Sequence, residues 1–98
     1  MAPEQIEPSF GSIGPWTDVY ALGAVLYSLL IGRPPYLGQT LADFLVQIVA
    51  ARMPPGVDHF RPDLPREVAD LCMRCLQKDP SIRFQDMRDL KRAAVALL

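Results

Sequence analysis

The sequence carries almost no excess charge, because ten Lys and Arg residues stand against eleven Asp and Glu residues, for a net charge of −1. A nucleic-acid-binding domain of this size normally has a basic excess, so nucleic acid is not an expected partner. The longest charge-free apolar run covers residues 19–32. That run is shorter than the roughly 20 residues that a membrane-spanning helix needs, so no membrane span is expected in this chain.

Reactive residue types are also scarce, with two Cys and one His among 98 residues. No secretion leader opens the sequence, so the protein is expected to be cytoplasmic and its thiols reduced. Cys72 and Cys75 could bind zinc only with two more ligands, and His59 is the only histidine available. Both cysteines fall within an expected helix, on its apolar stripe, where core packing is the better interpretation.

The residues that are abundant point to a helical fold. Half of the chain is hydrophobic, which argues against disorder, and its length allows one domain only. Ten prolines divide it into segments, and no segment shows sustained alternation of apolar and polar residues. Strands are therefore not expected, and the predicted fold class is all-α.

A long helix is expected over residues 19–31, with Thr17 or Asp18 as its N-cap and Gly32 just after its end. No charge follows Asp18 until Arg33, and apolar residues occupy every face of the helix. Such a helix needs neighbours on all sides. Either the domain has an exposed apolar flank or it is part of something larger.

Three amphipathic helices are expected after this central one. They begin near Thr40, Pro65 and Asp86, and prolines stop the first two, at residues 54–55 and at residue 80. Their inward stripes are expected to be Leu41, Phe44, Leu45, Ile48 and Val49; then Val68, Leu71, Cys72, Cys75 and Leu76; and finally Met87, Leu90, Ala94 and Leu97.

Four short segments resemble one known family. They read Met-Ala-Pro-Glu at residues 1–4, Thr-Asp-Val-Tyr-Ala-Leu-Gly at 17–23, Leu-Ile-Gly-Arg-Pro-Pro-Tyr at 30–36 and Cys-Leu-Gln-Lys-Asp-Pro-Ser-Ile-Arg-Phe at 75–84. In this order and spacing they resemble the C-terminal lobe of a protein kinase catalytic domain. The resemblance implies that residues 1–98 run from the end of the activation segment to the last helix of that lobe.

The resemblance also implies a subtype and a reaction. Leu-Gln-Lys-Asp-Pro at residues 76–80 is similar to Ser/Thr kinases, and Gly-Arg-Pro-Pro-Tyr at 32–36 is similar to bacterial ones. The parent enzyme would use ATP and Mg to phosphorylate Ser or Thr of a protein substrate. The helix that follows Thr40 would lie on the substrate side, where Gln39, Asp43 and Gln47 are either contacts or a solvated face.

Three residues take structural roles from the resemblance. Glu4 of Ala-Pro-Glu is expected to form a buried, bidentate pair with Arg83, because the guanidinium fork matches both carboxylate oxygens. In the family, the residue at Asp18 accepts hydrogen bonds from the catalytic loop. That loop is missing from this sequence, so Asp18 is expected to act as an N-cap.

The motifs for catalysis are missing from this sequence. It has no Gly-x-Gly-x-x-Gly, His-Arg-Asp or Asp-Phe-Gly, and its only lysines, Lys78 and Lys91, are expected on solvated helix ends. No catalytic, cofactor-binding or metal-binding residue is therefore expected, and the chain alone should be inactive. The N-lobe and catalytic loop would be its missing partners.

Two alternatives remain open. Met1 stands where many kinases have a Met before Ala-Pro-Glu, so the chain is expected to be a truncated reading frame or a gene fragment, unless Met1 was added for expression. The other reading of its function is a stand-alone α-helical interaction module, which would use its uncovered apolar flank to bind a partner helix.

Overall fold

The computed structural model describes residues 2–50 and 52–97, and no strand occurs among them. The all-α prediction is confirmed. The elements are α1 (Pro3–Ile6), the 3-10 helix η1 (Pro8–Phe10), α2 (Pro15–Ile31), α3 (Leu41–Val49), α4 (Val57–Phe60), α5 (Arg66–Cys75) and α6 (Met87–Val95). Met1, which belongs to the first motif, lies outside the described residues.

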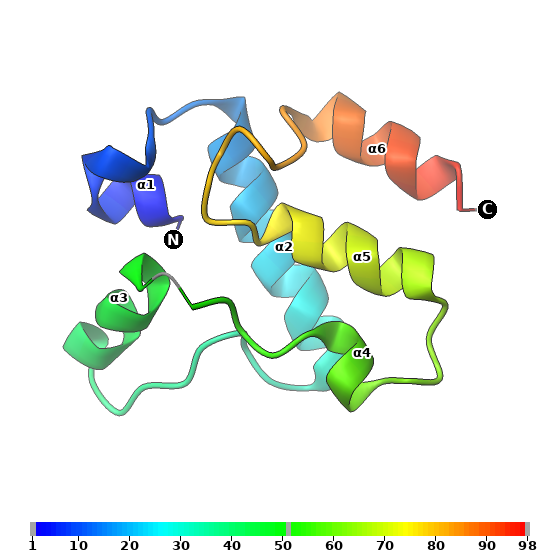
Figure 1. The fold of residues 1–98 in the computed structure, drawn as a ribbon, viewed down its shortest axis with the longest axis horizontal. Helices are drawn as coiled ribbons and strands as arrows, with labels where there is room; N and C mark the ends of the chain where they lie inside the picture. Colours follow the sequence, from blue (N-terminus) through cyan, green and yellow to red (C-terminus); the bar gives the residue numbers. More distant parts are fainter. Residues whose placement is uncertain (1, 51, 98) are drawn as a thin grey trace.

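The long helix α2 runs through the middle of the molecule (Figure 1). Helices α4, α5 and α6 pack against it, whereas α1 packs against α3 on the other side. The approach of α5 depends on Gly23, because a Cβ placed there would lie 2.5 Å from the Cβ of Cys75. A side chain at residue 23 would therefore push the two central helices apart.

The start of α2 differs from the prediction. The helix begins at Pro15 with Gly14 as N-cap, so the expectation that Thr17 or Asp18 is the N-cap is wrong. Proline suits the first helical position, because its missing N–H would have no partner there. The Thr17 hydroxyl instead accepts a hydrogen bond from the Gly14 amide at 3.1 Å. The other end follows the prediction, with Gly32 in the left-handed region at φ 85°.

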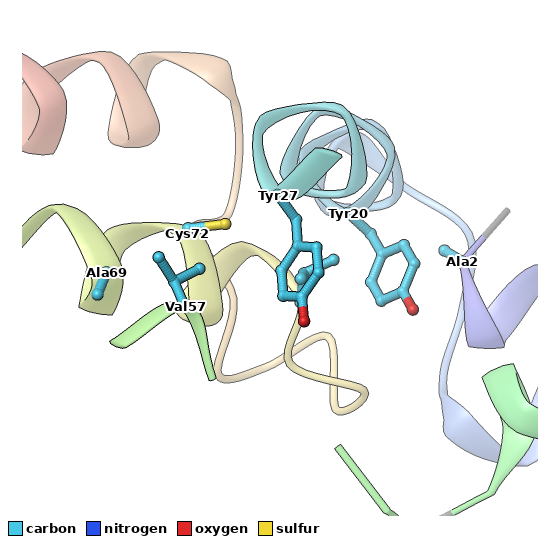
Figure 2. Close-up of a cluster of buried hydrophobic side chains, with 7 residues drawn as sticks. Ala2, Tyr20, Tyr27, Val57, Ala69 and Cys72 are labelled. Carbon is cyan, nitrogen blue, oxygen red and sulfur yellow. The ribbon is translucent and has the colours of Figure 1, made fainter. Parts of the chain in front are cut away.

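The main core lies along one face of α2. Tyr20 and Tyr27 leave the helix on the same side and pack with Val57, Ala69 and Cys72 (Figure 2). The opposite face carries Leu22, Val25 and Leu29, which are all exposed, Leu29 to 78%. We call these three residues the open face of α2. A helix that is apolar all round is thus covered on one side only by the described residues.

The amphipathic helices bury less than predicted. In α3 only Ile48 is fully buried, and Leu41 is exposed. In α6 only Leu90 is buried, so the inward placement of Met87 and Leu97 is wrong, whereas Ala94 is exposed but lines the same apolar cavity as Leu90. The reason is that α6 lies at the edge of the molecule and touches the core through Leu90 and half-buried Ala93. The α5 stripe is closer to the prediction, with Cys72, Cys75 and Leu76 buried.

Replacement of Gly23 by Ala tests the close packing of α2 and α5. Helix propensity alone would make Gly23→Ala stabilising by about 1 kcal/mol. We expect net destabilisation, because overpacking costs about 1–3 kcal/mol. Urea unfolding followed by circular dichroism measures the difference. Ala21→Gly, at an exposed position of the same helix, measures how much helix propensity alone changes the free energy of unfolding. A Gly23→Ala variant more stable than the parent would contradict the close approach.

Candidate functional site

The most completely bonded polar site joins α1 to the loop between α5 and α6. Glu4 comes from α1, and Arg83 from the loop between α5 and α6. The guanidinium donates from Nη1 to Oε2 and from Nη2 to Oε1, both at 2.6 Å. Both side chains are 0% exposed. The structure thus brings together the two residues that the kinase resemblance pairs.

The surroundings of Arg83 satisfy the rest of its hydrogen-bonding capacity. Nη1 also donates to the carbonyl of Trp16 at 3.0 Å. Nη2 also donates to the carbonyl of Lys78 at 3.2 Å, and Nε donates to that of Gln77 at 2.6 Å. Each of the five N–H groups of the guanidinium therefore has an acceptor. The site ties α1, the start of α2 and the loop after α5 to one side chain.

The Glu4 carboxylate is held in its charged form. Burial by itself would raise the pKa of Glu4, but hydrogen bonds from Arg83, from the backbone and from Thr17 outweigh it and lower the pKa below its ordinary 4.5. The Thr17 hydroxyl donates to Oε2 at 2.8 Å. Thr17 is a member of the site that the sequence reading missed. Its position next to Asp18 in the second motif is the only signal that could have found it.

Asp18 lies apart from this ion pair. It is exposed in the first turn of α2, and among the described residues its carboxylate has no hydrogen bond or ion pair. It cannot be the N-cap, because the helix has already begun three residues earlier at Pro15. A role in holding a catalytic loop stays a prediction.

Lys78 is the second residue that the sequence placed wrongly. The prediction of a solvated helix end is wrong, because Lys78 is 6% exposed. Its Nζ donates to the carbonyls of Gln47, at 2.9 Å, and Ala50. It also lies 5.0 Å from the ring centre of Tyr36. Lys91, by contrast, is exposed as predicted. One feature of the sequence could have indicated the contact of Lys78 with α3. The last turn of α3 contains no basic residue, although the helix dipole makes a cation favourable there.

The two cysteines have the properties of core residues. Both are free and buried. Burial raises the pKa of Cys72 to about 12 and that of Cys75 to about 11. Within residues 2–50 and 52–97 no group of three His, Cys, Asp or Glu side chains could hold a metal ion. These thiols are therefore packing groups, as the sequence indicated.

Neither buried cation among the described residues is free to contact a nucleotide phosphate. The two buried cations are already engaged, Arg83 with Glu4 and Lys78 with backbone carbonyls. A nucleotide site would need a cradle of amides and cations free to contact phosphates, together with carboxylates that hold the metal.

The family model described as "Protein kinase domain" matches residues 1–94. The chain belongs to the protein kinase family. Within the family it is a partial Ser/Thr protein kinase domain, and the fold is similar to that of the twitchin kinase region from C. elegans. The TM-score is 0.75 at 25% sequence identity, over 92% of this chain and 15% of the twitchin chain.

Curated kinases of bacteria and fungi are similar in sequence. Serine/threonine-protein kinase PknE of Mycobacterium tuberculosis is 36% identical over 98 residues, which is all of this chain and 17% of PknE. PrkC of Bacillus subtilis is 29% identical over 91 residues, 93% of this chain and 14% of PrkC. Cytokinesis protein sepH of Aspergillus niger is 36% identical over 91 residues and 6% of its length. This partial kinase domain thus spans well under a fifth of each relative.

No helix among the described residues of this kinase domain is both long and apolar enough to cross a membrane.

Removal of one partner of the buried pair should be strongly destabilising. Arg83→Met leaves the Glu4 carboxylate buried and unpaired, and we expect a loss of about 3–5 kcal/mol in the free energy of unfolding. The exposed pair of Arg66 and Asp70, at 3.7 Å, provides the matched control. Arg66→Met should cost no more than about 1 kcal/mol. Equal losses in urea titrations of the two variants would contradict the special role of Arg83.

The same pair predicts a dependence of stability on pH. The pKa of Glu4 is lower in the folded state than its ordinary 4.5, so its contribution is complete above that value. The contribution is lost as the pH falls through the folded-state pKa. We expect the difference in unfolding free energy between the parent and Glu4→Gln to shrink between pH 6 and pH 3. A difference that stays constant over this interval would show that Glu4 is not held in its charged form.

Proposed function

We propose that residues 1–98 form the C-terminal part of a Ser/Thr kinase catalytic domain, from the end of the activation segment to the last helix. The complete enzyme would transfer the γ-phosphate of ATP to Ser or Thr hydroxyls of a protein substrate. The observation that supports this most is the Glu4–Arg83 pair. It joins the first and the last of the four kinase-like segments through two 2.6 Å hydrogen bonds.

In this proposal the chain supplies scaffold and substrate-side surface, and not the reacting groups. ATP and Mg would be held by the N-lobe, the catalytic loop and a metal-binding motif, none of which is found in this sequence. Asp18, exposed at the start of α2, would hold the catalytic loop through its backbone amides. The enzyme would work in the cytoplasm.

Uncovered apolar surface supports the proposal. The open face of α2 borders an apolar cavity of about 220 Å³ that α5 and α6 complete through residues such as Leu71 and Leu90. An apolar surface of this kind marks a contact with further protein. In a whole catalytic domain the remaining part of the lobe would cover it.

Two buried hydroxyls support it as well. Tyr20 and Tyr36 are both buried and their hydroxyls interact with each other, but among the described residues neither hydroxyl has a hydrogen-bond partner outside this pair. Both residues line a cavity of about 190 Å³ that reaches Phe44 of α3. One of the two hydroxyl protons therefore lacks an acceptor, at a cost of about 1–3 kcal/mol, so a further segment that supplied an acceptor would be stabilising.

A segment exchange with a relative tests the function. Residues 1–98 would replace the matching segment of PknE, which is 36% identical over this whole chain. We expect the chimera to bind Mg-ATP and to transfer labelled phosphate to a protein substrate, whereas the 98-residue chain alone should do neither. The chimera with Arg83→Met should lose transfer, and the chimera with Arg66→Met should keep it.

Two results would contradict the proposal. One is saturable binding of Mg-ATP by the chain alone in calorimetry. The other is a chimera that folds and binds Mg-ATP but transfers no phosphate. The alternative of a stand-alone interaction module would then gain support, with the open face of α2 as its contact surface.

A further inference from the structure

Lys78 carries a buried charge for which the described residues provide no carboxylate partner. Its side chain reaches the end of α3, and its Nζ donates to the carbonyls of Gln47, at 2.9 Å, and Ala50. None of the ion pairs found among the described residues includes Lys78. A buried ammonium is costly unless it is hydrogen-bonded, so these carbonyls are the groups that make its burial possible.

The end of α3 needs such a cation. The last four carbonyls of a helix have no partner within it, and the helix dipole places partial negative charge there. The last turn of α3 contains no basic residue. Lys78, about 30 residues further along the chain, supplies the missing positive charge and two donated hydrogen bonds.

The backbone of Lys78 links this contact to the buried ion pair. Its carbonyl accepts a hydrogen bond from Nη2 of Arg83 at 3.2 Å. Its side chain lies 5.0 Å from the ring centre of Tyr36, in the loop that leads into α3. One residue therefore connects the Glu4–Arg83 pair to both the entry and the end of α3.

The residues that Lys78 contacts also line a cavity. A cavity of about 590 Å³ is lined by Tyr36, Gln47 and Ala50 together with the segment that contains Met53 and Pro54. The first three are the residues that Lys78 contacts, although Lys78 itself does not line the cavity. Lys78 thus contacts residues of the cavity wall without lining the cavity itself.

We propose that Lys78 is a positioning residue, whose buried ammonium holds α3 and this cavity wall in place. Under the proposed kinase function, on which this step rests, α3 faces protein substrates. The recognition of substrate would then depend on a charge that the substrate never touches. The removal of that charge would release α3 while α2 and α5 stay folded.

Hydrogen exchange of the whole 98-residue chain tests the proposal. Lys78→Met keeps the length of the side chain and removes its charge and donors. We expect the amides of residues 44–50 to exchange about 10–100-fold faster, because about two hydrogen bonds to a charged group are lost. The amides of α5 should change by less than about threefold. Lys78→Arg should restore most of the protection, since it keeps a cation at the helix end.

Lys91→Met is the matched control, because Lys91 is the only other lysine and is exposed. It should leave exchange in α3 unchanged. The proposal confines the effect of Lys78→Met to α3, so three results would overturn it. They are equal acceleration of exchange in α3 and α5, no acceleration in α3, and a Lys78→Met chain that does not fold.

The unmodified chain offers a second test that needs no variant. Acylation of the two lysines, followed by mass spectrometry, should label Lys78 at least about tenfold more slowly than Lys91 in the folded chain, and at an equal rate in urea. Equal rates in the folded chain would overturn the burial on which the proposal depends.

A kinetic measurement separates this proposal from the proposed function. In the PknE chimera, Lys78→Met should raise the KM for protein substrate severalfold and leave kcat and the KM for ATP unchanged. A chimera that is active but insensitive to Lys78→Met would overturn the role of Lys78 and leave the kinase function standing. Hydrogen exchange in the chain alone can support the role of Lys78 even if the chimera is inactive.

Discussion

A buried guanidinium is the constraint on which the rest of this structure depends. Arg83 has five N–H groups out of contact with water, and each must find an acceptor. Its acceptors come from α1, from the start of α2 and from the loop after α5. The requirement that every N–H of Arg83 has an acceptor therefore fixes how these three parts of the chain lie relative to one another. The apolar core between α2 and α5 forms beside them.

The polar and apolar parts of the molecule differ in how complete they are. The Glu4–Arg83 site has all of its charges and donors satisfied, as a buried network must if it is to stabilise one conformation. Among the described residues nothing covers the open face of α2, and the hydroxyls of Tyr20 and Tyr36 have no partner outside their own pair. A partial kinase domain explains both the complete polar site and the uncovered surfaces. Its internal hydrogen bonds can be complete while other surfaces remain suited to contact with the rest of the catalytic domain.

The sequence predicted local structure well and contacts over long distances unevenly. Helix ends marked by Gly32 and Thr40 were found because caps depend on nearby residues. The meeting of Glu4 and Arg83 followed from family motifs, since composition alone would have placed both charges in water. Lys78 was misplaced because its carbonyl partners lie about 30 residues away. The α6 stripe failed because periodicity cannot tell an edge helix from a covered one.

The separation of Glu4 and Arg83 along the chain bears on how the protein is made. The two residues are 79 positions apart, so the carboxylate leaves the ribosome long before the guanidinium exists. Closing a loop of that size costs about 4 kcal/mol of chain entropy, and this cost can be met only after Arg83 has been synthesised. Until Arg83 has left the ribosome Glu4 is an ordinary hydrated side chain, and the native arrangement around it cannot form before then.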